Sequence, residues 1–566
     1  MDNWQSLAGA AALLLCSNCA VANASPCTAL LGGTVAGNGT VTLAEDIAAA
    51  KDQPGGVYTA PDGSTYPNTP AFCRIAATLK PTPESDINIE VWLPAGSAWN
   101  GRFVGTGNGG YAGAMVYSEL GSTLSLGFAV ANTDMGSAPA TTFNGEPLTG
   151  QRQKQIDFGY RSTHLMTVAG KEIVQNFYGN PADRSYFTGC STGGGQAYHE
   201  AEQFPDDYDG IVGGGPAENR TNLHVSILWD YAITNVAPKA QMSEPLLQTV
   251  TGAVLHACGT QNGGLASDPF LADPRSCHWD PGQLACTATQ TTNCLNPDQV
   301  QAIRLYYDGP RDPRTGARIY PGAMRGSESG SLFDLAALEG QTFAGVAPPG
   351  PLFDGLFFWV FGPNWNWQSF DFDRDVARVD NDLGPIANAN SIDLSAFRAH
   401  GGKFIGHHGW ADQLVPPQDD IDYFLRLAAS LQDRSSDARS GIAKAHSFFR
   451  LFMAPGQGHC LPTGPGPNTY GGADNPNPPG TDTPNNNVLL ALQQWVENGV
   501  APEQIIATKY LNDTPSAGVL MTRPLCVFPK IAHYNGHGST NDAANFTCID
   551  DGVTANQFAA PQYLRN

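Results

Sequence analysis

The sequence predicts an α/β fold in which helices cover a parallel sheet and one long insertion interrupts the core. Short apolar runs alternate with amphipathic segments, as in strand–helix–strand units. A glycine-rich turn containing a serine lies between one apolar run and the following amphipathic segment. The alternation stops at about residue 217 and resumes at about residue 396. With 566 residues, 41% of them hydrophobic, the chain can bury a large core.

The first half of the chain supplies most of the expected core elements. Range 87–93 alternates between apolar and polar residues, which predicts a strand, and range 164–178 has the apolar spacing of a helix. Further strands are expected at 102–104, 127–132, 184–188 and 209–212, and a further helix at 195–204. These elements assign residues 25–216 to the core.

The segment 217–395 does not continue the alternation, and it contains a cluster of aromatic residues between 353 and 372. Beyond it we expect strands at 403–407, 448–453 and 504–510, with helices at 421–431 and 488–496. We therefore predict one catalytic domain built from 25–216 and 396–566, with 217–395 inserted as a lid domain.

Residues 1–24 have the pattern of a signal peptide. An apolar run at 8–15 is followed by small residues and by an Ala-Asn-Ala cleavage pattern before Ser25. That run is too short to cross a bilayer, and no other segment approaches 18 apolar residues, so we expect no membrane anchor. The sequence thus predicts a secreted or periplasmic protein.

Composition limits the partners of the protein. Lys and Arg total 30 against 52 Asp and Glu, for a formal net charge of −22. A chain this acidic binds nucleic acid or anionic membranes poorly, so neither is expected as a partner.

Gly189-Cys190-Ser191-Thr192-Gly193 matches the G-x-S-x-G pattern of a nucleophile elbow. Its position between a predicted strand and a predicted helix is the context that this motif requires. The sharp turn exposes the serine hydroxyl at the start of the helix, where developing negative charge is favoured. We therefore interpret Ser191 as a catalytic nucleophile rather than a bystander in a glycine turn.

A serine nucleophile needs a base and an acid that orients the base, and in this architecture the acid precedes the histidine. Asp412 follows the predicted strand 403–407, and His459 follows the predicted strand 448–453. Both lie where the carboxyl ends of strands assemble sites. Alternative acids and bases lie nearby in the sequence. Asp419 and Asp420 are expected to be exposed on a helix, while His407 and His408 precede the acid and would invert the order.

Ten of the twelve cysteines follow the predicted signal peptide, and an even number in an exported chain predicts disulfides. Cys190 precedes Ser191 and Cys460 follows His459, so a disulfide between them would join the nucleophile and base loops. A reactive Cys190 thiol is the alternative. Spacing favours further local pairs, without proving them: Cys258–Cys277, Cys286–Cys294 and Cys526–Cys548.

An oxyanion hole is expected from two backbone N–H groups. One is that of Thr192, the residue after the nucleophile, and the other lies in the glycine-rich loop after strand 102–104, which we assign to Gly107. The alternative for this loop is a phosphate cradle, but no lysine follows it.

The sequence resembles the tannase/feruloyl esterase family, which also includes mono(hydroxyethyl) terephthalate hydrolase. The resemblance spans most of 27–550 and rests on five segments. They are Tyr-Phe-Thr-Gly-Cys-Ser-Thr-Gly-Gly at 186–194, Asp-Gly-Ile-Val at 209–212, His-Gly-Trp-Ala-Asp at 408–412, Pro-Gly-Gln-Gly-His-Cys at 455–460 and Arg-Pro-Leu-Cys at 523–526.

The resemblance implies an α/β-hydrolase core with a lid, and the catalytic residues Ser191, Asp412 and His459. It further implies hydrolysis of esters of aromatic acids. Five disulfides are implied: Cys27–Cys73, Cys190–Cys460, Cys258–Cys277, Cys286–Cys294 and Cys526–Cys548.

Members of the family often carry a calcium loop in the lid, and this chain departs from that pattern. Gly259 and Asn262 stand where the family has carboxylates, which leaves Asp268 and Asn262 as the remaining ligands. Because calcium prefers several charged oxygen ligands, the departure weakens the case for a structural calcium. No cofactor is expected for catalysis.

The expected function is hydrolysis of a small aromatic ester, feruloyl or galloyl, through an acyl-enzyme. Alternatives are a terephthalate-monoester hydrolase, an inactive binding protein on the same scaffold, and a serine peptidase. The intact order of serine, acid and histidine argues against the inactive protein.

Overall fold

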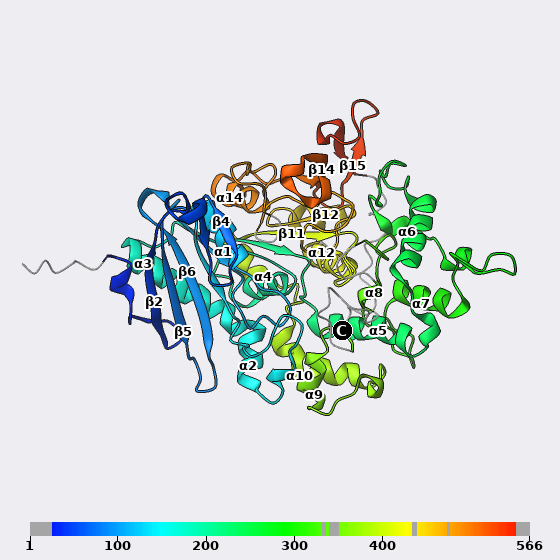
Figure 1. Ribbon diagram of the computed structural model, residues 1–566, viewed down its shortest axis with the longest axis horizontal. Coiled ribbons are helices and arrows are strands. Elements are labelled where there is room, and N and C mark those ends of the chain that lie inside the picture. Colours follow the sequence, from blue (N-terminus) through cyan, green and yellow to red (C-terminus); the bar gives the residue numbers. More distant parts are fainter. Residues whose placement is uncertain (1–24, 331–334, 339–349, 433–437, 473–475, 551–566) are drawn as a thin grey trace, which may run out of the picture.

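The computed structural model describes residues 25–330, 335–338, 350–432, 438–472 and 476–550. Its centre is a ten-stranded sheet with the strand order β1-β2-β5-β6-β8-β7-β9-β10-β11-β12 (Figure 1). The strands are β1 Thr34–Val35, β2 Gly39–Ile47, β5 Phe72–Leu79, β6 Ile87–Pro94, β7 Arg102–Thr106, β8 Ala129–Thr133, β9 Arg184–Cys190, β10 Gly210–Gly214, β11 Lys403–Gly409 and β12 Phe449–Ala454.

The sheet is mixed, so the expectation of a parallel sheet is correct for only part of it. Strands β8, β7, β9, β10, β11 and β12 run parallel, whereas β1, β2, β5, β6 and β8 pair antiparallel. Among the antiparallel pairs, β1–β2 and β5–β6 are joined by short loops, which need no crossover helix. Three two-stranded sheets lie outside: β3 Val57–Thr59 with β4 Thr65–Pro67, β13 Gln504–Tyr510 with β14 Val519–Cys526, and β15 Ile531–Tyr534 with β16 Phe546–Ile549.

Helices cover the parallel half of the sheet. α4 (Thr192–Gln203) packs on β9 and β10, α3 (Ser162–Tyr178) on β8, and α14 (Val488–Asn498) on β10 and β11. The core helices are α1 Tyr117–Ser125, α2 Arg152–Ile156, α3 Ser162–Tyr178, α4 Thr192–Gln203, α11 Ser395–His400, α12 Gln418–Leu431, α13 Ala438–Ala445 and α14 Val488–Asn498. The α/β-hydrolase core predicted from the sequence is thus present, and α4 begins three residues earlier than expected.

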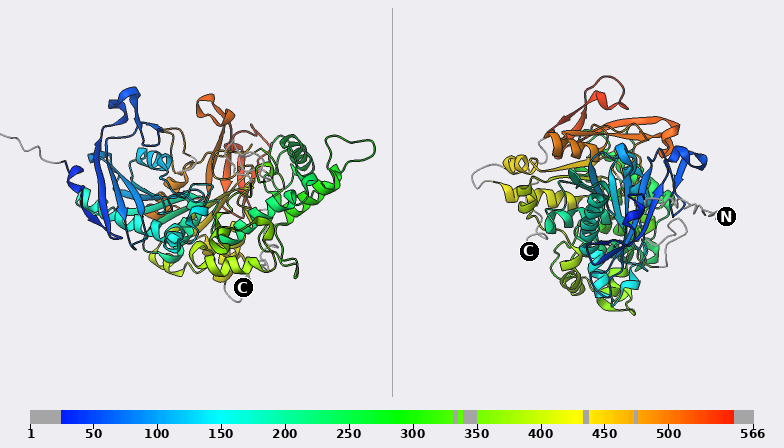
Figure 2. Two further views of the ribbon diagram at one scale, coloured as in Figure 1. Left: turned by 60° about the horizontal axis from the view of Figure 1, so that its bottom comes forward. Right: turned by 90° about the vertical axis from the view of Figure 1, so that its left-hand side faces the viewer.

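Between β10 and β11 the described residues add no strand to the sheet, and six helices take their place. They are α5 Arg220–Asn235, α6 Glu244–Cys258, α7 Pro297–Asp308, α8 Leu335–Leu338, α9 Gly355–Phe361 and α10 Asp375–Ala387. In Figure 1, α5, α6, α7 and α8 lie at the end of the molecule opposite the N-terminal strands, whereas α9 and α10 lie below its centre, next to α2. Figure 2 shows the molecule from two further sides. Their role as a lid, and the boundaries 217–395, stay predictions.

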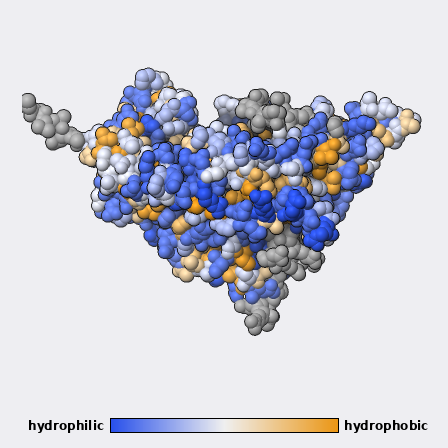
Figure 3. All heavy atoms as spheres, turned by 90° about the horizontal axis from the view of Figure 1, so that it is seen from below, coloured by the Kyte–Doolittle hydropathy of each residue, from blue (hydrophilic) through white to orange (hydrophobic). Residues whose placement is uncertain are grey.

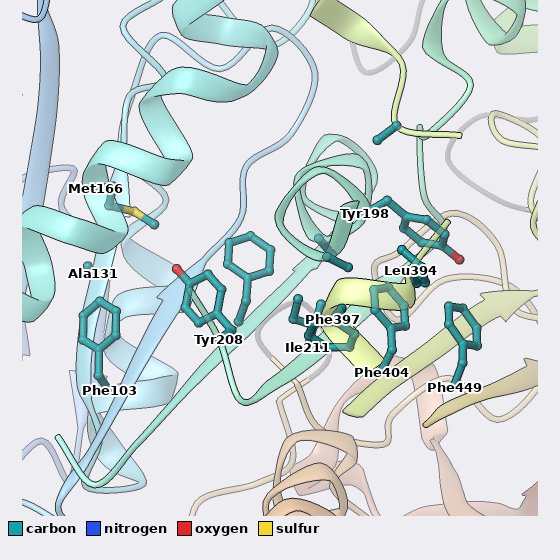
Figure 4. Close-up of a cluster of buried hydrophobic side chains, with 14 of the residues drawn as sticks. Phe103, Ala131, Met166, Tyr198, Tyr208, Ile211, Leu394, Phe397, Phe404 and Phe449 are labelled. Carbon is teal, nitrogen blue, oxygen red and sulfur yellow. The ribbon is translucent and has the colours of Figure 1, made fainter. Parts of the chain in front are cut away.

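An aromatic cluster fixes α4 to the sheet behind the serine turn (Figure 4). Tyr198 of α4 packs edge-on against Phe404 of β11 with ring centroids 4.9 Å apart, and Phe404 stacks on Phe449 of β12 at 4.5 Å. All three side chains are buried. Because interiors are close-packed, this contact restricts the position of α4, whose first turn follows Ser191.

The face shown in Figure 3 is mainly hydrophilic, with apolar residues scattered in small patches. Among the described residues, no helix combines the length and the hydropathy needed to cross a membrane.

Candidate active site

Ser191 occupies the sharp turn between β9 and α4. Its backbone has φ 63° and ψ −120°, a strained conformation for a residue with a side chain. Glycines make the turn possible, because a Cβ on Gly189 would lie 2.9 Å from the backbone of Gly193. The turn has the geometry of a nucleophile elbow, with the hydroxyl displayed above the sheet.

A hydrogen-bond chain links Ser191 to two residues that follow later strands. Ser191 Oγ lies 2.8 Å from His459 Nε2, and His459 Nδ1 lies 2.6 Å from Asp412 Oδ2. The other carboxylate oxygen of Asp412 accepts the backbone N–H groups of Leu414 at 3.0 Å and Val415 at 2.9 Å. The structure thus brings together the three residues that the sequence predicts as nucleophile, base and acid. The arrangement is suited to proton transfer from the serine to the imidazole.

His408 is a second imidazole bound to Asp412. Its Nε2 lies 3.2 Å from Asp412 Oδ2, and its Nδ1 lies 3.3 Å from Asp420 Oδ2. Burial alone would lower the pKa of His408, but the two carboxylates outweigh burial and raise it to about 9. Burial would raise the pKa of Asp412, but His459 and His408 outweigh it and lower the pKa to about 2. The acid is therefore held ionised between two imidazoles.

The expectation that Asp419 and Asp420 are exposed is wrong. Both are almost completely buried, because the first turn of α12 faces the core. Asp420 accepts a hydrogen bond from Tyr198 at 2.6 Å in addition to its contact with His408. Acidic side chains in the first turn of a helix are usually exposed to solvent. Here the tertiary contact with α4 buries them instead.

The Cys190–Cys460 disulfide joins the two loops that carry Ser191 and His459. Its Cα atoms are 5.9 Å apart, and the two cysteines are separated by 270 positions in the sequence. The bond lies directly beside the serine–histidine contact, and it leaves no free thiol at Cys190.

The glycine loop after β7 lies against the serine turn, but the assignment of Gly107 as an oxyanion donor is wrong. Its N–H donates to Thr188 O at 2.9 Å and continues the pairing of β7 with β9. The next N–H, of Asn108, donates to Gln196 Oε1 at 2.9 Å. Among the described residues, no acceptor is in hydrogen-bond range of the N–H groups of Gly109 and Gly110, which come next in the loop.

The matches to known proteins span the part of the chain that carries Ser191, Asp412 and His459. The family model described as "Tannase and feruloyl esterase" matches residues 73–549. The chain belongs to the tannase and feruloyl esterase family. It is 36% identical over 530 residues to an uncharacterized esterase of Xanthomonas campestris, covering 91% of each chain. A probable feruloyl esterase B-2 of Aspergillus flavus is 34% identical, over 82% of this chain and 85% of that protein.

Solved structures agree with the family assignment. Feruloyl esterase B of Aspergillus oryzae superposes with a TM-score of 0.78 at 30% identity, covering 90% of this chain and 97% of that one. A tannin acyl hydrolase of Aspergillus niger has a TM-score of 0.72 at 20% identity, over 94% and 96% of the two chains, and supports the fold. As a member of this family, the protein is a carboxylic ester hydrolase.

Four further disulfides accompany Cys190–Cys460. They are Cys27–Cys73, Cys258–Cys277, Cys286–Cys294 and Cys526–Cys548.

Asp268 and Asn262, the residues considered for calcium, lie in a loop after α6. Asp268 Oδ1 accepts a hydrogen bond from Arg523 at 2.8 Å, and both side chains are buried. The guanidinium of Arg523 therefore occupies the position beside Asp268 where a bound calcium ion would have to lie. Within the described ranges, no three His, Cys, Asp or Glu side chains are grouped so that they could hold a metal ion.

The aromatic residues between 353 and 372 pack on one another and on residues outside the segment 217–395. Phe357 stacks on Trp365 with centroids 4.9 Å apart, and Trp359 packs against Tyr111 and Phe158. Trp359 also donates to Gly145 O at 2.7 Å, which ties α9 to the loop before α2.

Sequence reasoning missed Gln196 and Arg220, which lie close to the serine turn. Gln196 orders the glycine loop through Asn108, as described above. Arg220 Nη2 donates to Thr192 Oγ1 at 2.7 Å. The available signal was modest: Arg220 is the one Lys or Arg between 204 and 238, in an otherwise neutral or acidic stretch.

Proposed function

We propose that this protein is an exported serine esterase that hydrolyses feruloyl or galloyl esters through Ser191, His459 and Asp412. The observation that carries the proposal is the continuous chain of hydrogen bonds from Ser191 Oγ through His459 to Asp412. The names of the relatives, which include feruloyl esterases, favour an aromatic acid as the acyl group.

In the proposed mechanism, His459 Nε2 accepts the proton of Ser191 as Oγ attacks the ester carbonyl carbon. The tetrahedral intermediate collapses when His459 returns the proton to the leaving alcohol, which yields an acyl-enzyme. Water then attacks the acyl carbon, with His459 accepting its proton and returning it to Ser191. The aromatic acid is released.

Asp412 keeps the imidazole in the tautomer that accepts at Nε2 and stabilises the imidazolium that forms. The N–H of Thr192 is suited to bind the oxyanion, because it lies at the first position of α4 and has no partner within the helix. The second donor in this proposal is an N–H of Gly109 or Gly110.

The segment 217–395 is proposed to act as a lid that encloses the aromatic ring of the substrate. Export is supported by the five disulfides, which persist in oxidising compartments. The predicted signal peptide at 1–24 lies outside the described residues.

Ser191→Ala provides the test. The variant should fold with an unchanged melting temperature and should lose turnover of methyl ferulate and methyl gallate by a factor of about 10⁴ or more. Retained turnover would contradict the assignment of the nucleophile. Stoichiometric labelling of the wild type by an organophosphonate separates an esterase from an inactive binding protein, which would not react. Casein digestion tests for peptidase activity.

A further inference from the structure

Arg220 is a buried arginine that has no acidic partner. It begins α5, and only 6% of its surface is exposed. Within the described residues, Thr192 Oγ1 is its one hydrogen-bond acceptor, and no carboxylate lies within 4.0 Å of its guanidinium. A guanidinium has five N–H donors, so most of the donors of Arg220 are unused by the protein.

Unpaired buried cations are unusual, because a charge removed from water is unfavourable unless an opposite charge or several hydrogen bonds compensate it. Burial lowers the pKa of Arg220 to about 10, so the side chain keeps its charge at neutral pH. The guanidinium lies 5.0 Å over the ring of Phe158, a contact that favours the cation but does not satisfy its N–H groups. The fold therefore maintains a positive charge without an ionic partner at this place.

This charge lies beside the proposed reaction centre. Thr192, the residue after Ser191, accepts from Arg220 and in turn donates to Gly110 O at 2.7 Å. Arg220 is thus connected to both segments that supply the proposed oxyanion donors. Asn219, just before α5, and Asn222 of α5 line a groove along α10. Arg220 points in a different direction, toward Thr192 and the serine turn.

The neighbouring side chains are aromatic or neutral. His224 lies one turn beyond Arg220 on α5, and its Nδ1 is 2.8 Å from Phe353 O. Burial, reinforced by the charge of Arg220, lowers the pKa of His224 to about 3, so it adds no second positive charge at neutral pH. Phe158 also packs against Tyr111. The side chains named around Arg220 therefore supply no negative charge to pair with it.

We propose that Arg220 binds a carboxylate carried by the substrate, so that the enzyme prefers an ester with a free carboxylate to the neutral ester of the same shape. The inference rests on the proposed function, since it concerns the substrate of that same site. An anion next to the guanidinium gains charge-assisted hydrogen bonds in a site of low dielectric constant. A neutral substrate leaves the cation uncompensated.

The carboxylate can belong to the acid or to the alcohol portion of the ester, and matched pairs of substrates distinguish the two. Monomethyl and dimethyl terephthalate differ in charge on the acid side. Chlorogenate and its methyl ester differ in charge on the alcohol side. Within each pair the reacting ester bond is the same.

The experiment compares kcat/KM for both pairs in wild type, Arg220→Gln and Arg220→Lys. A charge-assisted contact predicts that wild type prefers the anionic member of at least one pair by roughly 10- to 100-fold. Arg220→Gln should abolish the preference by slowing the anionic substrate more than the neutral one. Arg220→Lys should retain part of it, because it keeps the charge but loses the planar fork.

Arg450→Gln is the matched control. Arg450 is also nearly buried and lies over an aromatic ring, but it is paired with Glu503 at 2.7 Å. Its loss should leave the ratio within each substrate pair unchanged. Melting temperatures and organophosphonate labelling of Ser191 verify that each variant is folded.

Equal kcat/KM for the two members of both pairs in wild type would overturn the inference, even if Arg220→Gln failed to fold. So would an equal loss on anionic and neutral substrates in a folded Arg220→Gln protein. Binding of monomethyl and dimethyl terephthalate to Ser191→Ala, measured by calorimetry, separates this failure from failure of the proposed function. A preference for the anionic ligand in that protein supports the inference without any turnover, and equal binding opposes it.

Discussion

Removing the Cys190–Cys460 disulfide tests how the structure holds the serine and the histidine together. In the chain-entropy description, a crosslink stabilises the fold by restricting the unfolded chain, and its effect grows with the length of the closed loop. For a sequence separation of 270, this gives about 5.6 kcal/mol at 25 °C. For the Cys286–Cys294 disulfide, with a separation of 8, it gives about 2.5 kcal/mol.

The double variants Cys190→Ala/Cys460→Ala and Cys286→Ala/Cys294→Ala therefore form a matched pair. The first should lose about 3 kcal/mol more of its free energy of unfolding than the second. Urea unfolding followed by fluorescence measures this difference under identical conditions. Each variant removes one disulfide and leaves the other four in place.

Activity should separate the two variants further. Cys190 and Cys460 adjoin Ser191 and His459 in the sequence. Without their disulfide, the two loops can move apart and lengthen the 2.8 Å hydrogen bond between Ser191 Oγ and His459 Nε2. A displacement of about 1 Å between reacting groups can cost about 10²-fold in rate. We expect the first variant to lose at least this factor in kcat on methyl ferulate, and the second to keep wild-type kcat. Equal destabilisation of the two variants, or full kcat in the first, would refute the reasoning.

Two further predictions concern the surroundings of the reaction centre. In wild type, the pKa of about 9 for His408 means that its stabilising contribution is complete below about pH 6.5 and is lost as the pH rises through 9; urea unfolding between pH 6 and 10 should show this decline, which His408→Gln should lack. Gly107→Ala should lower both kcat and melting temperature, since the new Cβ would lie 2.5 Å from Gly193 Cα, whereas Gly109→Ala, with no atom within 4 Å, should be mild. Similar losses in the two glycine variants would contradict the close approach.

The parts of the site that the sequence predicts are those encoded by local pattern. The serine turn needs glycines at fixed offsets, and Asp412 and His459 each follow an apolar run that forms a strand. Parallel strands place their carboxyl ends at one edge, so residues after different strands meet there without any further information. Cys190 and Cys460 each lie one position from a residue of the hydrogen-bond chain, so the same reasoning predicts that they lie close enough to form a disulfide.

The parts that sequence reasoning missed depend on contacts between distant segments. Gly107 lies in a glycine-rich loop whose composition is typical of an oxyanion loop. Only the register of β7 against β9 shows that its N–H already donates to Thr188 O. Asp420 looks solvated at the start of a helix until α4 brings Tyr198 against it. Arg220 belongs to no motif, and its importance is visible only because the folded chain offers it no carboxylate.

The overall acidity of the chain and the cation at Arg220 act over different distances. The formal charge of −22 counts every carboxylate as ionised, yet some are buried beside one another. Burial raises the pKa of Glu218 well above its usual value and that of Asp419 to about 7, so these groups add less negative charge than the composition indicates. Exposed charges are screened beyond about 8 Å at physiological ionic strength, whereas a buried guanidinium in contact with a ligand is screened little. An acidic surface is therefore compatible with selection of an anionic ester, because the surface affects the approach and Arg220 affects the bound state.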